Sequence, residues 1–346
     1  MSRLSRRLSR ATPSAPRVTD LSAYPTTLAW SASGQLLAVG QDSGEIALMA
    51  VASGAPTHRI HAHEGPVQSL AWHPHRDALV STGQDGAVRI WEAPYASGRE
   101  LMAPGDVWTD HACWSAKGDR LAIARGPRAH VFADDKQTCA TEPSPSTLEG
   151  LAFSPSGKSL GVACYGGVRL FDPSTGRTTR RLEWRGSMIS LAFAPDGTVV
   201  ACGCQDNSVH FWRIASGKDA QMSGFPSKPR SIAFNHDGQW LATTGDAAIC
   251  LWPFDKRGPE GRHPVQLVGH EDLVVELAFA PLVDLLLSGG KDGVVALWAP
   301  PKHTAPVFVA SIGAKVTRVA WGADGHAEVL RWAAAGANGR VMIGEL

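Results

Sequence analysis

Residues His63–Trp91 read HEGPVQSLAWHPHRDALVSTGQDGAVRIW, and residues His270–Trp298 read HEDLVVELAFAPLVDLLLSGGKDGVVALW. Both stretches place a histidine, a serine, an aspartate and a tryptophan at successive intervals of 18, 4 and 6 residues. The two sets are His63, Ser81, Asp85, Trp91 and His270, Ser288, Asp292, Trp298. Identical spacing in distant parts of one chain indicates an internal repeat.

The repeat extends over the whole chain when it is aligned on an apolar residue, a small residue and an aromatic anchor. Eight such triplets occur, and their anchors are spaced 42, 42, 39, 40, 41, 45 and 42 residues apart. The anchors are Trp30, Trp72, Trp114, Phe153, Phe193, Phe234, Phe279 and Trp321. After most anchors come a glycine-containing turn and short apolar segments separated by polar turns, as at Ser156-Gly157. Four short strands in about 40 residues make one blade of a β-propeller.

The sequence therefore predicts an all-β fold, a single closed β-propeller of eight four-stranded blades over residues 17–346. Seven blades plus an extra C-terminal segment is the alternative, but residues 316–343 could not bury their apolar face alone. The eighth repeat ends after its third strand, and Arg17–Leu21 is a spare strand before the first anchor. We expect Arg17–Leu21 to pair with Arg340–Gly344 and close the ring, because closure removes exposed strand edges.

These spacings and the four-residue sets resemble the WD-repeat family, and the resemblance covers nearly everything after residue 17. In that family the histidine, serine, aspartate and tryptophan form one buried hydrogen-bonded network, so the resemblance implies this role for both sets. The fifth repeat departs from the pattern, with Trp184 at the histidine position and Cys202 at the serine position. The sixth has Phe225 at the histidine position.

Composition narrows the classes of partner. The chain of 346 residues carries 33 basic and 32 acidic residues, a net charge of +1, so we expect no nucleic-acid partner. It has no long apolar run for membrane insertion, and its six scattered cysteines favour a reducing, cytoplasmic location. Residues 1–16 hold four arginines and no acid, which predicts a disordered basic tail, with organelle targeting as the alternative. We expect a monomer.

No catalytic, metal-binding or cofactor-binding constellation is predicted. His63, Ser81 and Asp85 superficially suggest a nucleophilic triad, but a matching set in a second repeat argues against a single active site. The predicted turns separate the histidines near residue 63 from one another, namely His58, His61, His63, His73 and His75. The alternative function is a ligand, metal or enzymatic site at the central channel, where first strands would supply Gln68, Ser69, Arg230, Glu276 and Arg318.

The leading hypothesis is a non-catalytic scaffold that binds protein or peptide partners, because family members bind partners on the upper loop face and channel mouth. One candidate position lies six residues before the anchors, at Tyr24, Trp108, Lys228 and Lys315. The second precedes the network aspartate position, at Gln41, Gln84, Gln205 and Lys291. Tyr24 and Trp108 are the first hot-spot candidates because large aromatic side chains dominate interfaces, and packing between blades is the open alternative for both.

Overall fold

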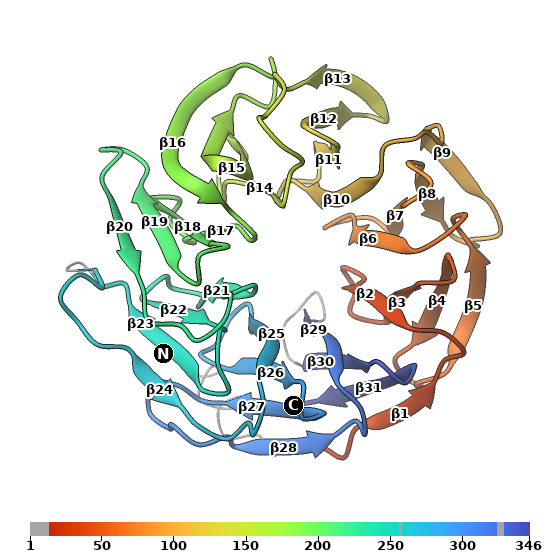
Figure 1. The fold of residues 1–346 in the computed structure, drawn as a ribbon. Helices are drawn as coiled ribbons and strands as arrows, with labels where there is room; N and C mark the ends of the chain where they lie inside the picture. Colours follow the sequence, from red (N-terminus) through yellow and green to blue (C-terminus); the bar gives the residue numbers. More distant parts are fainter. Residues whose placement is uncertain (1–13, 256–257, 324–328) are drawn as a thin grey trace.

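The structure is a computed structural model that describes residues 14–255, 258–323 and 329–346. Eight antiparallel sheets stand around a common axis as the blades of one ring (Figure 1). The predicted all-β propeller of eight blades is confirmed, and the seven-blade alternative is wrong because β29 to β31 form a full member of the ring.

The first four blades follow chain order, with the first strand of each nearest the axis. Blade one consists of β2 (Pro25–Trp30), β3 (Leu36–Gln41), β4 (Glu45–Ala50) and β5 (Pro56–His61). Blade two consists of β6 (Val67–Trp72), β7 (Ala78–Gly83), β8 (Val88–Glu92) and β9 (Gly98–Met102). Blade three consists of β10 (Thr109–Trp114), β11 (Leu121–Arg125), β12 (Arg128–Ala133) and β13 (Lys136–Ala140). Blade four consists of β14 (Gly150–Phe153), β15 (Leu160–Phe171) and β16 (Thr178–Ser187).

The remaining blades repeat the order. Blade five consists of β17 (Ala192–Phe193), β18 (Val199–Gly203), β19 (Val209–Arg213) and β20 (Asp219–Met222). Blade six consists of β21 (Ile232–Phe234), β22 (Trp240–Thr243), β23 (Ile249–Pro253) and β24 (Val265–Leu267). Blade seven consists of β25 (Val274–Phe279), β26 (Leu286–Gly290), β27 (Val294–Trp298) and β28 (Phe308–Ser311). Blade eight consists of β29 (Val316–Ala323), β30 (Leu330–Gly336), β31 (Arg340–Glu345) and β1 (Arg17–Asp20).

Blade four has three strands in place of four, because the long strand β15 occupies two strand positions. The first part of β15 pairs with β14, from Gly150↔Ala163 to Phe153↔Leu160. Its second part pairs with β16, including Val168↔Leu182. Gly166 and Gly167 between the two parts have φ values of 89° and 119°, which an L side chain rarely adopts. The two parts of β15 therefore take the second and third positions of the blade.

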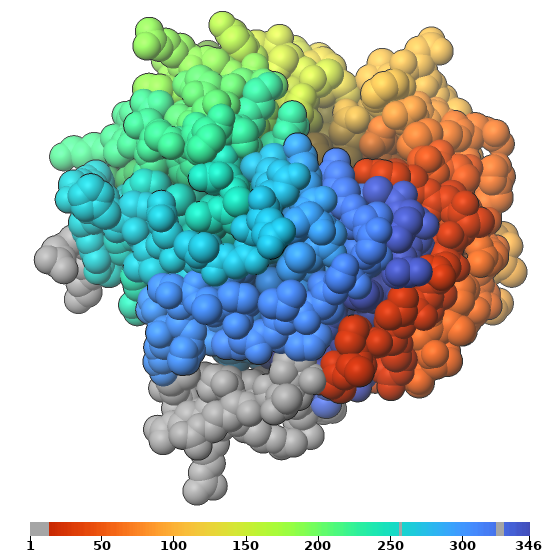
Figure 2. All heavy atoms as spheres, turned by 60° about the horizontal axis from the view of Figure 1, so that its bottom comes forward, coloured from red at the N-terminus to blue at the C-terminus, as the bar shows by residue number. Residues whose placement is uncertain are grey.

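The two ends of the chain meet in blade eight. Strand β1 pairs antiparallel with β31, from Arg17↔Ile343 to Asp20↔Arg340, and Arg340 Nε donates to Asp20 Oδ1 at 2.9 Å. Figure 2 shows the red N-terminal strand against the blue C-terminal blade. The predicted closure is confirmed. The predicted tail falls almost wholly on residues 1–13, outside the described residues.

The core lies between neighbouring blades, because each middle strand buries both faces. In β3, Leu37 and Val39 pack toward blade eight, in one cluster with Ala333. The alternate residue Ala38 packs toward blade two, in a cluster with Leu70. This period of two follows from strand geometry, and it explains why the second and third strands are apolar at consecutive positions.

Four anchor tryptophans also link neighbouring blades by hydrogen bonds. Each donates its indole N–H to the carbonyl of the small residue in the preceding blade's triplet. The pairs are Trp30 to Ala320 at 3.3 Å, Trp72 to Ala29 at 3.1 Å, Trp114 to Ala71 at 3.3 Å and Trp321 to Ala278 at 2.9 Å. The first of these bonds crosses the junction between blades eight and one, where the ring closes.

Candidate functional site

Hydrogen bonds hold the two predicted surface positions together on one face of the ring. The backbone N–H of Gln84 donates to the Pro66 carbonyl at 3.1 Å, and that of Gln205 donates to Ser187 at 3.0 Å. The N–H of Lys291 donates to Leu273 at 2.9 Å. Each bond joins the loop that enters a first strand to the turn between the second and third strands. We call the face that carries these loops the upper face.

Tyr24 and Trp108 are exposed on this face. Tyr24 is 39% exposed and Trp108 is 52% exposed, so neither residue is buried between blades. The Tyr24 backbone N–H donates to Asp42 Oδ1 at 3.1 Å, which fixes the start of its loop. Both aromatic rings are therefore available to a partner.

The other predicted partner-binding residues differ in exposure. Gln205, Lys291 and Lys315 are exposed, whereas Gln84 and Lys228 are half-buried. They belong to blades two, five, six, seven and eight, so the structure spreads them around the upper face and does not gather them in one cluster.

Gln41 was assigned to this surface wrongly. Its side chain is fully buried, and its amide donates to Glu45 Oε1 at 3.3 Å. Gln41 is the last residue of β3 and corresponds to Gly83 of β7, where a Cβ would collide with the His63 ring. Blade one has no such histidine, so a longer side chain fills the space. The surface position belongs to Asp42, which is exposed and whose N–H donates to the Tyr24 carbonyl at 3.0 Å.

Tyr165 is a surface residue that the sequence reasoning missed. It follows its anchor Phe153 by 12 residues, as Gln84 follows Trp72 by 12. Its side chain is 55% exposed, and its backbone N–H donates to Ser146 Oγ at 2.9 Å. Counting from every anchor would have found it. The described residues thus include three exposed tyrosine or tryptophan residues, Tyr24 and Trp108 on upper-face loops and Tyr165 beside the glycine bend of β15.

In blade two, the structure brings the four predicted network residues together. Trp91 Nε1 donates to Ser81 Oγ at 2.9 Å, and Ser81 Oγ lies 2.8 Å from His63 Nε2. His63 Nδ1 lies 2.9 Å from Asp85 Oδ1. Because the ionised Asp85 carboxylate can only accept, Nδ1 carries the proton of the neutral His63 ring, and Nε2 accepts from the Ser81 hydroxyl, whose oxygen accepts from the indole. Burial lowers the pKa of His63, against the opposing effect of Asp85.

Blade seven repeats this geometry. Trp298 Nε1 donates to Ser288 Oγ at 2.8 Å, Ser288 Oγ lies 2.8 Å from His270 Nε2, and His270 Nδ1 lies 3.0 Å from Asp292 Oδ2. Burial would raise the pKa of Asp292, but the backbone N–H groups of Val294 and Glu271 together with His270 lower it below its ordinary value. Each aspartate therefore ties an upper-face loop to the blade interior, and the fully bonded network makes that loop rigid.

In blades five and six, other side chains replace part of the His–Ser–Asp–Trp network. In blade five, Trp184 stacks on His210 with ring centroids 3.9 Å apart, and His210 Nε2 lies 2.9 Å from Asp219 Oδ2. In blade six, Thr243 Oγ1 accepts from Trp252 Nε1 at 3.2 Å. Thr243 follows its anchor at the same distance as Ser81, a signal that the sequence reasoning overlooked.

The polar residues of the first strands hold the blades to one another. Ser69 Oγ accepts from the Ala112 N–H of the next blade at 3.3 Å. Glu276 Oε2 accepts from the Val319 N–H at 2.6 Å. Burial raises the pKa of the Glu276 carboxyl, against the opposing effect of Arg318. Gln68 is half-buried, whereas Arg230 and Arg318 are exposed.

Within the described part of the chain, no three histidine, cysteine or carboxylate side chains converge closely enough to hold a metal ion. His73 Nε2 contacts the Gly118 carbonyl at 3.0 Å, and His75 Nε2 contacts the Ala116 carbonyl at 3.1 Å. None of the described residues forms a helix with the length and hydropathy needed to cross a bilayer.

Family models match several of the repeats. The WD domain, G-beta repeat model matches residues 54–92, 177–213, 220–253 and 261–299. The model of the anaphase-promoting complex subunit 4 WD40 domain matches residues 18–66.

Curated relatives match over most of this chain. Striatin-4 of Homo sapiens is 26% identical over 285 residues, which cover 72% of this chain and 38% of that protein. THO complex subunit 3 of Arabidopsis thaliana is 24% identical over 248 residues, which cover 70% of this chain and 65% of that protein. Telomerase protein component 1 of Mus musculus is 25% identical over 282 residues, which cover 81% of this chain and 9% of that protein. The chain thus spans less than two thirds of the length of each of these relatives.

A solved structure shows the same fold. The crystal structure of the computationally designed Ika8 protein aligns with a TM-score of 0.78 and 18% identity, covering 94% of this chain and 98% of the designed chain. The matching repeat models, the relatives and the eight-bladed ring show that this chain belongs to the WD-repeat (WD40) β-propeller family.

Proposed function

We propose that this protein is a non-catalytic scaffold that binds a protein or peptide partner on its upper face. Propellers host many functions, so the proposal depends on the site and not on the fold alone. The name of the Arabidopsis relative places that protein in a complex, which supports a protein as the class of partner.

The observation that carries the proposal is the placement of the exposed aromatic side chains. All three that the described residues contain lie on the upper face, Tyr24 and Trp108 on loops and Tyr165 beside the bend of β15. Burying a large exposed aromatic side chain against a partner lowers the free energy of the complex. Aromatic residues also dominate the binding energy of interfaces. The surrounding charges are mixed, with Lys291 and Asp42 both exposed, which suits a polar rim.

Affinity capture with the full chain as bait, followed by titration of each captured partner, tests the proposal. Alanine substitution at Tyr24, Trp108 and Lys291 should weaken partner binding. At the two aromatic positions the loss should be about tenfold or more, as expected for hot spots. Unchanged affinity for every captured partner would remove the upper face from the proposal.

Two exposed apolar residues elsewhere provide matched controls. Leu282 is 47% exposed in the turn that follows β25, and Val309 is 52% exposed on the outer strand β28. Leu282→Ala and Val309→Ala remove exposed apolar groups away from the upper-face loops, so both variants should keep partner affinity. If they weakened binding as much as Trp108→Ala, the partner would contact a different surface.

We also propose that the protein is a monomer and that it is located in the cytoplasm. All six cysteines are unpaired, and three of them are buried, which supports a reducing compartment. Light scattering on the purified chain and imaging of a C-terminally tagged chain test these two points. A stable dimer, or accumulation in an organelle, would contradict the corresponding part.

A further inference from the structure

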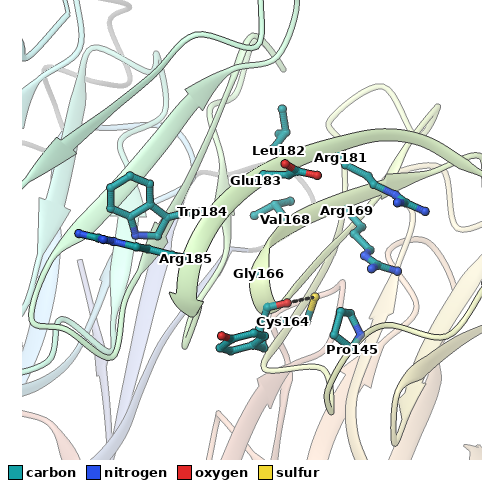
Figure 3. Close-up of a pocket in the computed structure, with 11 residues that line it drawn as sticks. Pro145, Cys164, Gly166, Val168, Arg169, Arg181, Leu182, Glu183, Trp184 and Arg185 are labelled. Carbon is teal, nitrogen blue, oxygen red and sulfur yellow. Dashed lines mark hydrogen bonds between the residues drawn. The ribbon is translucent and has the colours of Figure 1, made fainter.

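Blade four has a surface pocket of about 550 Å³ beside its outer strand. It is lined by the turn of β15 at Tyr165 and Gly166, by Pro145 in the loop from blade three, and by residues of β16. Figure 3 shows Arg169 and Arg181 side by side in this pocket, with both guanidinium groups pointing the same way.

These two arginines face each other across neighbouring strands. Arg169 of β15 is directly opposite Arg181 of β16 in the register. Like charges at directly opposite positions of an antiparallel pair repel and destabilise the sheet. The pair therefore reduces stability in the free protein, and a bound anion would remove the repulsion.

Among the residues that the structure describes, no acidic side chain forms an ion pair with Arg169 or Arg181. The arginines that do form ion pairs in the described residues are Arg17, Arg59, Arg89, Arg99, Arg213, Arg262, Arg331 and Arg340. Arg169 donates from NH1 to the Pro143 carbonyl at 3.0 Å. That bond orients the guanidinium group and leaves its other N–H groups for a ligand.

The charge of the pocket indicates the class of ligand. Its lining includes three arginines, Arg169, Arg181 and Arg185, and one carboxylate, Glu183, so its formal charge is 3 − 1 = +2. A phosphate monoester carries about −1.5 to −2 at pH 7 and accepts bidentate hydrogen bonds from arginine. A ligand with one carboxylate group, which carries a charge of −1, would neutralise only half of the pocket charge.

The surroundings indicate that a peptide carries this phosphate. Strand β16 is the outer strand of blade four, so its outward backbone groups can pair with an extended segment. The exposed Tyr165 ring and Pro145 add apolar surface at the end of the same pocket. We propose that the pocket beside β16 binds a phosphorylated peptide segment of a partner protein, with Arg169 and Arg181 as the paired phosphate donors. The pocket shares Tyr165 with the upper face, but its paired arginines belong to blade four, apart from Tyr24 and Trp108, and phosphate recognition goes beyond the proposed upper-face function.

Calorimetric titration of the full chain with three capped peptides tests the proposal. The probes are Ala-phosphoSer-Ala, Ala-Ser-Ala and Ala-Glu-Ala, with inorganic phosphate as a fourth probe. We expect the phosphopeptide to bind most tightly. Arg169→Gln and Arg181→Gln should each weaken it by about tenfold, the value of one hydrogen bond to a charged group. Arg177→Gln is the matched control, because Arg177 is an exposed arginine of the same blade that does not line the pocket, and it should change affinity much less.

Every other outcome overturns part or all of the proposal. Equal binding of the glutamate and phosphoserine peptides would contradict phosphate recognition, and binding of inorganic phosphate as tight as the phosphopeptide would contradict a peptide ligand. Unchanged phosphopeptide affinity in both arginine variants would contradict phosphate binding by Arg169 and Arg181. Thermal unfolding separates these results from misfolding. Loss of Arg181 relieves repulsion and should leave the melting temperature unchanged or higher, whereas Arg169→Gln also loses the hydrogen bond to Pro143 and should lower it by a few degrees at most. Failure of this test leaves the upper-face experiment unaffected, since the variants there lie on blades one, three and seven.

Discussion

Ser81 and Ser288 show how much one hydroxyl group organises in this protein. Each serine oxygen accepts an indole N–H and each hydroxyl donates to a histidine that is itself bonded to an aspartate. The aspartates accept backbone N–H groups of the upper-face loops, such as Glu64 to Asp85 at 3.2 Å and Glu271 to Asp292 at 2.9 Å. The buried serines therefore help to hold the loops of the proposed binding face in one conformation.

Ser81→Ala should reduce the free energy of unfolding by about 1–3 kcal/mol, because it leaves His63 Nε2 and the Trp91 indole buried without a partner. Urea denaturation of both proteins measures the difference. Ser43→Ala, at an exposed turn, should change stability by less than about 0.5 kcal/mol. Equal effects of the two substitutions would show that the blade-two network does not contribute.

Stability should also fall in mild acid. Burial lowers the pKa of His63 below its ordinary 6.5, so the unfolded chain takes up a proton near pH 6.5 that the folded chain does not. The unfolding free energy is then complete above pH 6.5 and decreases as the pH falls below it. The pKa of Asp85 is lowered from 3.8, so its contribution is lost only at more acidic pH. Urea midpoints at pH 7.5 and pH 5.5 measure the change, and an equal or higher midpoint at pH 5.5 would contradict it.

At single positions, the sequence predicted best where a residue has a fixed place in the repeat. The eight network residues follow identical intervals, and the structure brings each set of four together. Gln41 was misjudged because Asp42 lies one residue before the network aspartate position of blade one, so a count from Asp42 shifts by one residue. Tyr165 was missed because blade four has Gly166 in place of the aspartate and offers nothing to count from. A count of 12 residues from the anchor assigns Asp42 and Tyr165 to the surface correctly.

Among the strands, the anchor tryptophans distinguish some blade junctions from others. Four junctions have an indole hydrogen bond, and the other four have phenylalanine anchors, which pack but cannot donate. The sequence predicted the anchors as apolar markers of the repeat. It did not predict the bonds, because they depend on how closely two neighbouring blades approach.

Trp30→Phe should lower the unfolding free energy by about 1–3 kcal/mol, from the lost hydrogen bond to Ala320 and the smaller ring. Trp114→Phe removes a bond of the same 3.3 Å length at a junction away from the closure. Guanidinium denaturation of both variants should give similar losses, since the closing junction is built like the others. A loss confined to Trp114→Phe would show that blades eight and one do not pack as described.

For the whole molecule, the period of the anchors determined the number of blades, and the missing outer strand of the last repeat determined how the ring closes. Both predictions are confirmed by the pairing of β1 with β31. The pocket of blade four was not predicted, because Arg169 and Arg181 become neighbours only through the pairing of β15 with β16. Strand register, unlike repeat period, is not visible in a single sequence.

Hydrogen–deuterium exchange in two truncated chains tests the closed ring most directly. Deletion of residues 1–20 removes β1, whereas deletion of residues 1–13 keeps it and serves as the control. In the longer deletion, alternate amides of Arg340–Glu345 should exchange much faster, because they lose their partners in β1, and the melting temperature should fall by several degrees. In the control, these amides should stay as protected as in the full chain. Equal protection of Arg340–Glu345 in both deletions would contradict a ring closed by its two chain ends.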